Sequence, residues 1–285
     1  MIGKKKIKLS ILGLLFILLG VLSYEFLWGK VFPFTPVIIG FTKYELPHAN
    51  FYLQKETKYS DFTKIDTLIP KVEDFHKLKF LYKPDIFIFR DSSSFVRHSL
   101  VLTRFCTYYN RIFISPWALK EAGAGKISLE IYMRHELSHS LLNQNAGIIH
   151  SFGYPEWLKE GIAMFSANQM GTSFYPGKEE TYHLIGQGNF MPPEYFKTGK
   201  ARKVKFGIQN SPVFIYSEFA CIVDYLVATY GKEKFLLYMK ELLKNSNNDE
   251  VFKGVYNIEF SKVIQNFKSE VVENKEPNSN NINNR

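Results

Sequence analysis

The stretch from His135 to His139, which reads H-E-L-S-H, constrains the fold of this chain more than any other segment. Side chains four residues apart lie over each other on one face of an α-helix, so this spacing aims the His135 and His139 imidazoles at one point. Two neutral imidazoles make half of a tetrahedral zinc site, and Glu136 beside them can reach a water on the metal. The alternative is a helix with two surface histidines and a solvated glutamate. We favour a helix that carries two metal ligands and a general base.

The residues around the stretch predict a helix over 127–143. No proline interrupts this range, and Asn143, Asn145 and Gly147 follow as stop signals. Apolar residues recur at an approximately helical spacing, at Ile127, Ile131, Leu137, Leu141 and Leu142.

A zinc site of this kind needs a third protein ligand, with the fourth position left for water. A second helix is expected to begin at Pro155, and it offers two carboxylates, Glu156 and Glu160. Glu156 lies in the first turn, where the helix dipole alone favours an acidic residue. Glu160 lies one turn further along an otherwise apolar helix, where its charge needs a partner. We assign Glu160 as the third ligand and keep Glu156 as the alternative.

The two segments together resemble the gluzincin metallopeptidases. The residues from 155 to 163, P-E-W-L-K-E-G-I-A, are similar to the second motif W-L-x-E-G-x-A of the bacterial peptidase MA-like families. The resemblance implies that Glu160, 21 residues after His139, is the third zinc ligand. Residues 216–242 resemble the closing helices of such domains, and the similarity covers about residues 127–271.

This resemblance implies an α+β, zincin-like fold, with a small N-terminal mixed sheet and a helical C-terminal part. It implies one Zn²⁺ ion on His135, His139 and Glu160, which lowers the pKa of its water to about 7. Glu136 would take a proton from that water and pass it to the leaving amine. Tyr216 is the candidate donor to the oxyanion.

His150, Tyr182 and His183 compete with Tyr216 for the oxyanion role. The chain also departs from the thermolysin-like pattern, in which an acid four residues after the ligand glutamate orients a zinc histidine. Met164 occupies that position here, so Asp224 or a backbone carbonyl is expected to do so.

The N-terminus predicts a membrane anchor. Lysines at 4, 5, 6 and 8 precede an uncharged stretch over 9–24, and Tyr24 and Trp28 suit the membrane interface. We expect an uncleaved signal-anchor with the lysines in the cytoplasm and the domain outside the cell membrane; a cleaved signal, giving a secreted protein, is the alternative. The predicted organisation is residues 1–30 as lysines and anchor, 31–41 as interfacial linker, 42–272 as peptidase domain and 273–285 as disordered tail.

The formal net charge of the 285 residues is +9. A basic run contributes to it, consisting of Lys197, Lys200, Arg202, Lys203 and Lys205. We expect a solvated loop, with anionic lipid or an acidic substrate as alternative partners and no nucleic acid. Cys106 and Cys221 are too few for a disulfide framework and are expected to be buried free thiols.

Two strands are predicted before the metal helix, over 85–90 and 111–115. The second is either a sheet edge that pairs with extended substrate or an ordinary core strand. The Gly- and Pro-rich segment 171–212 is expected to border the cleft. Helices are expected at 217–230, 232–244 and 260–271.

These features favour a membrane-anchored, zinc-dependent peptidase that acts on a peptide or protein substrate. A catalytically inactive domain that binds peptide or protein is the main alternative. A zinc hydrolase or aminopeptidase for small substrates is the third, although no G-x-M-E-N-like segment is present to anchor a substrate amine. The sequence leaves the oligomeric state open.

Overall fold

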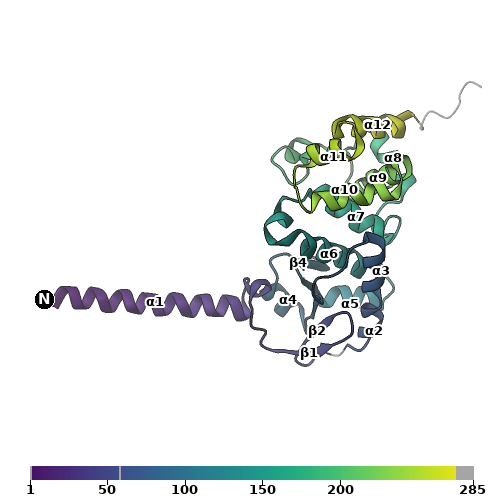
Figure 1. Cartoon of the computed structure of the whole chain (residues 1–285). Helices are drawn as coiled ribbons and strands as arrows, with labels where there is room; N and C mark the ends of the chain where they lie inside the picture. Colours follow the sequence, from purple (N-terminus) through teal and green to yellow (C-terminus); the bar gives the residue numbers. More distant parts are fainter. Residues whose placement is uncertain (1, 58, 274–285) are drawn as a thin grey trace, which may run out of the picture.

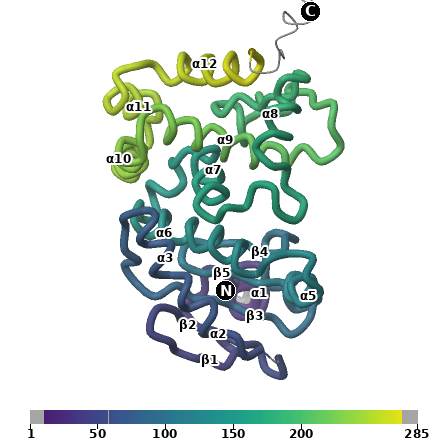
Figure 2. Tube along the Cα trace, turned by 90° about the vertical axis from the view of Figure 1, so that its right-hand side faces the viewer, coloured from purple at the N-terminus to yellow at the C-terminus, as the bar shows by residue number. Residues whose placement is uncertain are grey.

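The computed structural model describes residues 2–57 and 59–273, with side chains from residue 11 onward. One long helix, α1 (Ile2–Trp28), projects from a domain in which a sheet-containing part lies beside a helical part (Figure 1). Helix α6 (Leu129–Gly153) lies between the sheet and the C-terminal helices in both views (Figures 1 and 2). The mixed α+β class predicted from the sequence is therefore confirmed.

Five strands form one sheet in the order β1–β2–β3–β5–β4. They are β1 (Phe41–Glu45), β2 (Asn50–Gln54), β3 (Asp85–Ile88), β4 (Phe105–Tyr108) and β5 (Arg111–Ile114). The central strands β2, β3 and β5 are parallel, while β1 and β4 pair antiparallel at the two edges. The predicted strands over 85–90 and 111–115 are thus present, each slightly shorter than expected.

Of the two alternatives for residues 111–115, a sheet edge or a core strand, the structure shows the core strand. Strand β5 lies between β3 and β4, and its Ile112, Phe113 and Ile114 are fully buried. A strand covered on both faces reads as a continuous apolar run, which is the pattern of an interior strand. The edge is β4, which is less buried and joins β5 through a tight turn at Tyr109, where φ is 54°.

Successive side chains of the strands point to opposite faces of the sheet, so the core around the sheet has two layers. Ile86 and Ile88 face helices α3 (Leu68–His76) and α6, whereas Phe87 and Phe89 face the opposite side. Full burial of side chains of this size contributes about 1.5–3 kcal/mol each relative to exposure. The remaining helices of this part are α2 (Phe62–Asp66), α4 (Ser92–His98) and α5 (Pro116–Gly123).

The C-terminal part is helical. Its helices are α7 (Glu156–Ala167), α8 (Lys178–Gly186), α9 (Ser211–Tyr230), α10 (Lys232–Leu242), α11 (Asn248–Tyr256) and α12 (Phe260–Glu273), with 3₁₀ turns η2 (Pro193–Tyr195) and η3 (Ala201–Lys203). The predicted helices at 217–230, 232–244 and 260–271 correspond to α9, α10 and α12. The segment 171–212 is not a continuous loop, because α8 lies within it.

The chain between α1 and the sheet is fastened to the domain. The short 3₁₀ helix η1 (Phe32–Phe34) places the Phe32 ring among the aromatic side chains of the sheet, fully buried. The Arg111 guanidinium donates hydrogen bonds to the carbonyl oxygens of Phe32, Pro33 and Thr35, at 3.1, 3.2 and 2.6 Å. The residues predicted as an interfacial linker therefore include a packed strap, which we call the Arg111 clamp.

Within α1, the 18 residues from Ile11 to Trp28 are apolar and long enough to cross a membrane, and a signal sequence has the same character. Helix α9 also has this length and hydropathy, but over half of it is buried, as in a core helix. At the other end, Glu273 is the last residue of α12, and the rest of the predicted tail, 274–285, lies outside the described residues.

Candidate metal centre

Helix α6 begins and ends differently from the prediction of 127–143. Ser128 caps it by accepting a hydrogen bond from the Ile131 N–H at 3.3 Å. The helix continues past Asn143, whose side chain is half-buried. Gly147, with a φ of 74° that favours glycine, is where the helical geometry is interrupted.

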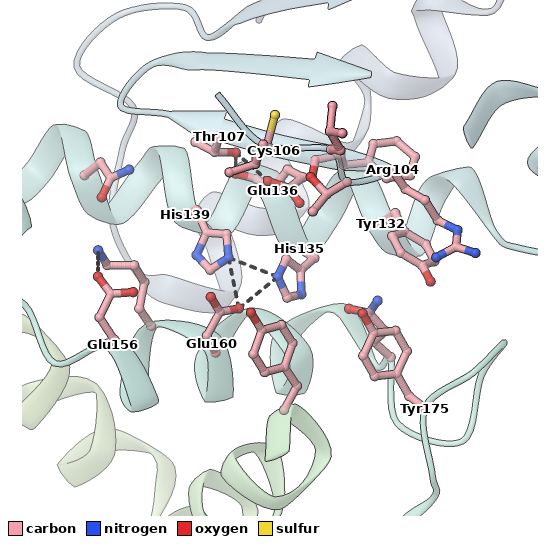
Figure 3. Close-up of a pocket in the computed structure, with 18 of the residues that line it drawn as sticks. Arg104, Cys106, Thr107, Tyr132, His135, Glu136, His139, Glu156, Glu160 and Tyr175 are labelled. Atoms are coloured by element: carbon pink, nitrogen blue, oxygen red, sulfur yellow. Dashed lines mark hydrogen bonds and ion pairs between the residues drawn. The ribbon is translucent and has the colours of Figure 1, made fainter. Parts of the chain in front are cut away.

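The middle of α6 points its two histidines away from the sheet. Leu137 and Leu141 are fully buried against the sheet and hold one face of the helix there. His135 and His139 project from another face toward α7 (Figure 3). The i, i+4 spacing therefore does what the sequence predicts, and both imidazoles face the same point.

Glu160 on α7 meets the two histidines. Its Oε2 lies 3.4 Å from Nε2 of His135 and 3.4 Å from Nε2 of His139, and the two Nε2 atoms are 3.0 Å apart (Figure 3). The three side chains are only 8, 12 and 9% exposed, in the order His135, His139 and Glu160. Among the described residues, this is the cluster of His, Cys, Asp and Glu that can hold a metal ion.

The spacing of these three atoms suits a metal ion. In a tetrahedral zinc site with bonds of about 2.0–2.2 Å, neighbouring ligand atoms are about 3.3–3.6 Å apart. The observed separations of 3.0–3.4 Å are close to that edge length. Two imidazole nitrogens and one carboxylate oxygen are also a common donor set for catalytic zinc. The donors therefore fit a divalent ion, and the sequence prediction that they converge is confirmed.

The charges at this cluster favour a bound cation. Burial alone raises the pKa of Glu160, but the neighbouring His139 and His135 outweigh burial and hold that pKa well below its usual range. Burial lowers the pKa of His135, yet hydrogen bonding to Glu160 and the charge of Glu136 outweigh it and raise the pKa. Both shifts reflect the attraction between the buried Glu160 carboxylate and the imidazoles, and Glu136 adds a second negative charge beside His135.

Glu160 reaches this place because α7 packs closely on α9. Leu158 and Ile162 are fully buried on the inner side of α7. At Gly161 a Cβ atom would lie 2.7 Å from the Phe219 carbonyl oxygen and 3.0 Å from a methyl of Val223. Only glycine allows the two helices to approach this closely without a shift, which explains the glycine after Glu160.

Glu156, the alternative third ligand, is not part of the cluster. Its two oxygens pair with Lys159 at 3.0 Å and Lys197 at 2.5 Å. Lys197, in left-handed backbone geometry with φ 56°, also lies 3.9 Å from Oε1 of Glu160. This first member of the predicted basic run thus reaches the candidate site, while its other members are exposed, as expected for a solvated loop.

The general base predicted at Glu136 is held by the edge strand. The Thr107 hydroxyl on β4 lies 2.6 Å from Oε2 of Glu136 and 3.2 Å from its backbone oxygen. This contact holds the carboxylate in the same pocket as His135, His139 and Glu160 and leaves its second oxygen for another partner. The edge of the sheet and the metal helix therefore meet at Glu136.

A pocket of about 670 Å³ contains this cluster and the residues around it. Tyr216 lines it and interacts through its hydroxyl with Glu160, and burial raises the pKa of this phenol. Tyr175, from the segment before α8, also lines the pocket, and burial raises its pKa as well (Figure 3). Both phenols therefore stay protonated at neutral pH and can donate a hydrogen bond.

The three competitors of Tyr216 lie outside the lining of this pocket. His150 is exposed beyond the kink in α6. The ring of Tyr182 packs on Phe267, with 6.0 Å between ring centres, and Nε2 of His183 lies 2.9 Å from the Gln187 amide. Tyr216 is the candidate that the fold brings to the cluster.

Asp224, expected as a partner of the zinc histidines, is elsewhere. It pairs with Lys178 at 2.5 Å, while Nδ1 of His135 and of His139 are buried without a hydrogen-bond partner among the described residues. The buried side chain of Gln169 is close enough to His135 to raise its pKa, and its Oε1 also lacks a hydrogen bond in the described chain. Gln169 is thus the side chain best placed to accept a hydrogen bond from His135.

Among the residues of this pocket, sequence reasoning did not anticipate Thr107, Gln169 and Tyr175, nor the contact of Lys197 with Glu160. Only the length of the segment 171–212 hinted at two of them. Both cysteines are free, as expected. Cys221 is buried; Cys106, next to Thr107, is half-buried, and desolvation raises its pKa to about 11.

A comparison with protein-family models finds no match for this chain, and a comparison with curated proteins finds none. The functional argument therefore depends on the geometry of the site and on the sequence motifs.

Proposed function

We propose that this protein is a membrane-anchored, zinc-dependent peptidase of the gluzincin type. One observation carries the proposal: His135, His139 and Glu160 converge at 3.0–3.4 Å with Glu136 beside them in the same pocket. A helix with two surface histidines would not need a buried carboxylate from another helix at this distance. The zincin-like fold expected from the resemblance is part of this proposal.

The chain's own residues support amide hydrolysis. When bound, zinc supplies Lewis-acid chemistry, polarising a carbonyl and making a water molecule acidic enough to ionise near pH 7. Glu136 accepts the proton of the attacking water and delivers it to the leaving amine. Thr107 holds the Glu136 carboxylate in place through its 2.6 Å contact, and Tyr216 offers a protonated phenol to the developing oxyanion.

A peptide is the favoured substrate class because the pocket lies against a sheet edge. Strand β4 pairs on one side only, with β5, so its other side can accept a further extended strand. Phe105 and Thr107 of this strand line the pocket. A peptide added along β4 would pass Glu136, whose backbone and side chain both contact Thr107.

Membrane anchoring by α1 completes the proposal. The apolar helix from Ile11 to Trp28 follows a run of lysines, which favours a cytoplasmic N-terminus and a domain on the outer side. Tyr24 and Trp28 are partly exposed near the end of the helix, where such side chains suit the interface. A cleaved signal would instead release the same domain.

Metal analysis and proteolysis of three variants test the function. Glu160→Ala is expected to lose the metal, because a buried ligand is removed, whereas Glu136→Gln should keep one ion per chain and lose cleavage. Glu156→Gln is the matched control: it alters a carboxylate one turn away on the same helix and should keep the metal. Metal content by mass spectrometry and cleavage of a broad peptide library are the measurements.

Two outcomes would contradict the proposal. If Glu160→Ala and the unsubstituted chain bind the same amount of zinc, the ligand set is wrong. If the zinc-loaded chain cleaves no peptide in the library, the inactive peptide-binding domain becomes the better explanation.

A further inference from the structure

Large apolar side chains are exposed around one end of the domain. We call them the apolar rim, and its members are Phe34, Leu100, Val101, Leu102, Ile148, Ile149 and Phe152. Ile149 and Phe152 are 82% and 84% exposed, which is extreme for side chains of this size. Scattered exposed leucines are ordinary, but a gathered set of this kind marks an interaction surface.

Hydrogen bonds and ring contacts bring the rim to the base of α1. The Lys30 ammonium, two residues after the helix, donates to the carbonyl oxygens of Val96 and Ser99, which fixes the segment 100–102 nearby. The Leu100 N–H donates to the Tyr108 hydroxyl at 2.8 Å, and the Phe34 ring packs on Tyr108 at 6.2 Å. Two parts of the rim thus adjoin the end of the candidate membrane helix.

The kink at Gly147 provides the third part. The helical geometry is interrupted there, and the segment beyond it presents Ile148, Ile149 and Phe152 to solvent instead of to the core. Ile148 and Phe152 line a second hollow of about 540 Å³ together with Phe34. Figure 1 shows α1 leaving the domain on this side, so a membrane crossed by α1 would lie alongside the rim.

The hollow at the rim is continuous with the metal pocket. Both are lined by Thr107, Asn143, Glu156 and Lys159. Val101 and Leu102 of the rim also line the metal pocket directly. A groove therefore runs past the edge strand β4 from the base of α1 to His135 and His139.

We propose that the apolar rim contacts the lipid bilayer into which α1 inserts, so that the groove receives membrane-tethered polypeptides close to where they leave the bilayer. The membrane-tethered substrate class rests on the proposed peptidase function, whereas the lipid contact rests on the rim and on membrane insertion of α1. We infer lipid as the partner of the rim because the rim adjoins the end of α1, and the exposed apolar surface of α1 also requires lipid.

Spin labels on the full-length chain test the lipid contact. Ile149→Cys and Leu100→Cys would each carry a nitroxide, with the exposed α10 residue Leu237→Cys as the matched control, in phosphatidylcholine–phosphatidylglycerol vesicles. The unsubstituted chain sets the background from the two native cysteines. We expect both rim labels to lie about 5–10 Å below the lipid phosphates, accessible to oxygen and protected from a water-soluble nickel chelate.

Two results would overturn the lipid contact. One is nickel accessibility at both rim positions equal to that of the Leu237→Cys control. The other is dipolar broadening between rim labels that disappears on dilution with unlabelled chain, because the rim would then cover a second copy.

A cleavage comparison tests the substrate class. One unstructured linker of mixed sequence is offered in two forms, free in solution and tethered to the vesicle by a single transmembrane helix. The reconstituted chain should cleave the tethered form about tenfold faster or more at equal bulk concentration. The double variant Leu100→Ser with Ile149→Ser, whose side chains line neither hollow, should reduce this preference and leave cleavage of the free linker unchanged. Part of the preference should remain, because α1 still holds the chain and the tethered substrate on one vesicle. The control Leu237→Ser should change neither rate.

The outcomes separate this proposal from the proposed function. Equal cleavage of the two forms by the unsubstituted chain would overturn the membrane-tethered substrate class while leaving a peptidase. Cleavage of neither form would contradict the peptidase, and the spin-label depths would still decide the lipid contact.

Discussion

Replacing Gly161 with alanine should reveal how far the metal centre depends on the close approach of α7 and α9. The new Cβ would lie 2.7 Å from the Phe219 carbonyl oxygen and 3.0 Å from Val223 Cγ2. The carbonyl belongs to the backbone of α9 and cannot rotate away. Helix α7 would have to move outward by several tenths of an ångström, and Glu160, the preceding residue, would move with it.

Two opposing contributions set the size of the effect on stability. Alanine is the better helix former by about 1 kcal/mol, whereas overpacking of this kind costs about 1–3 kcal/mol. We expect Gly161→Ala to lower the free energy of unfolding by about 1 kcal/mol. Gly254→Ala is the matched control, because Gly254 lies inside helix α11 with nothing within 4 Å of a new Cβ. This control should gain about 0.5–1 kcal/mol.

Urea unfolding in the presence of a chelator measures the stability of both variants without a contribution from bound metal. Competition with a chromophoric chelator then gives zinc affinity, which we expect to fall about tenfold or more in Gly161→Ala and to stay unchanged in Gly254→Ala. If the two alanine variants gain the same stability and bind zinc equally well, the close approach of α7 and α9 does not position Glu160.

Three further predictions concern the neighbours of the cluster. Thr107→Val should lower kcat about tenfold with unchanged metal content, because the Glu136 carboxylate loses its 2.6 Å partner; an unchanged kcat would count against the role of Thr107. Gln169→Leu should weaken zinc binding about tenfold by removing the acceptor nearest His135, whereas equal affinity in a chelator competition would show that another group orients this ring. Burial lowers the pKa of His76 to about 4 from about 6.5, so its neutral form stabilises the fold fully above pH 6.5, and about 3 kcal/mol is lost as the pH falls from 6.5 to 4. Urea unfolding between pH 6.5 and 4 should show that the free energy of unfolding falls less steeply with pH in His76→Gln than in the unsubstituted chain. Identical slopes would refute the role of His76 in this pH dependence.

The sequence predicted this cluster well because its side chains follow from the spacing of residues along two helices. Two histidines four residues apart define a helix face, and a proline followed by an acid one turn inside an apolar helix indicates the carboxylate that meets them. Of the two candidate carboxylates, Glu160 meets the histidines as predicted, whereas Glu156 lies in the first turn of α7 and pairs with Lys159 and Lys197. Each of these inferences needs only residues within one or two helical turns.

The remainder of the site depends on contacts between distant segments, which no local pattern records. Thr107 reaches Glu136 only because β4 takes the sheet edge next to α6, and that strand order follows from how the whole sheet is covered. Tyr175 and Lys197 come from segments rich in glycine and proline, where periodicity gives no direction. For the same reason the sequence left β5 as either an edge or a core strand, because its apolar run fits several positions until its neighbours are known.

The Arg111 clamp has a mechanical consequence. Because the Phe32 ring is buried against the sheet and one guanidinium holds the carbonyl groups of Phe32, Pro33 and Thr35, the segment after α1 cannot swing independently of the domain. A helix embedded in lipid would then act as a rigid post, and the pocket would stand at a set height above the headgroups. The distance of a peptide bond from the membrane surface would then decide whether it reaches the pocket, in addition to the side chains that flank it.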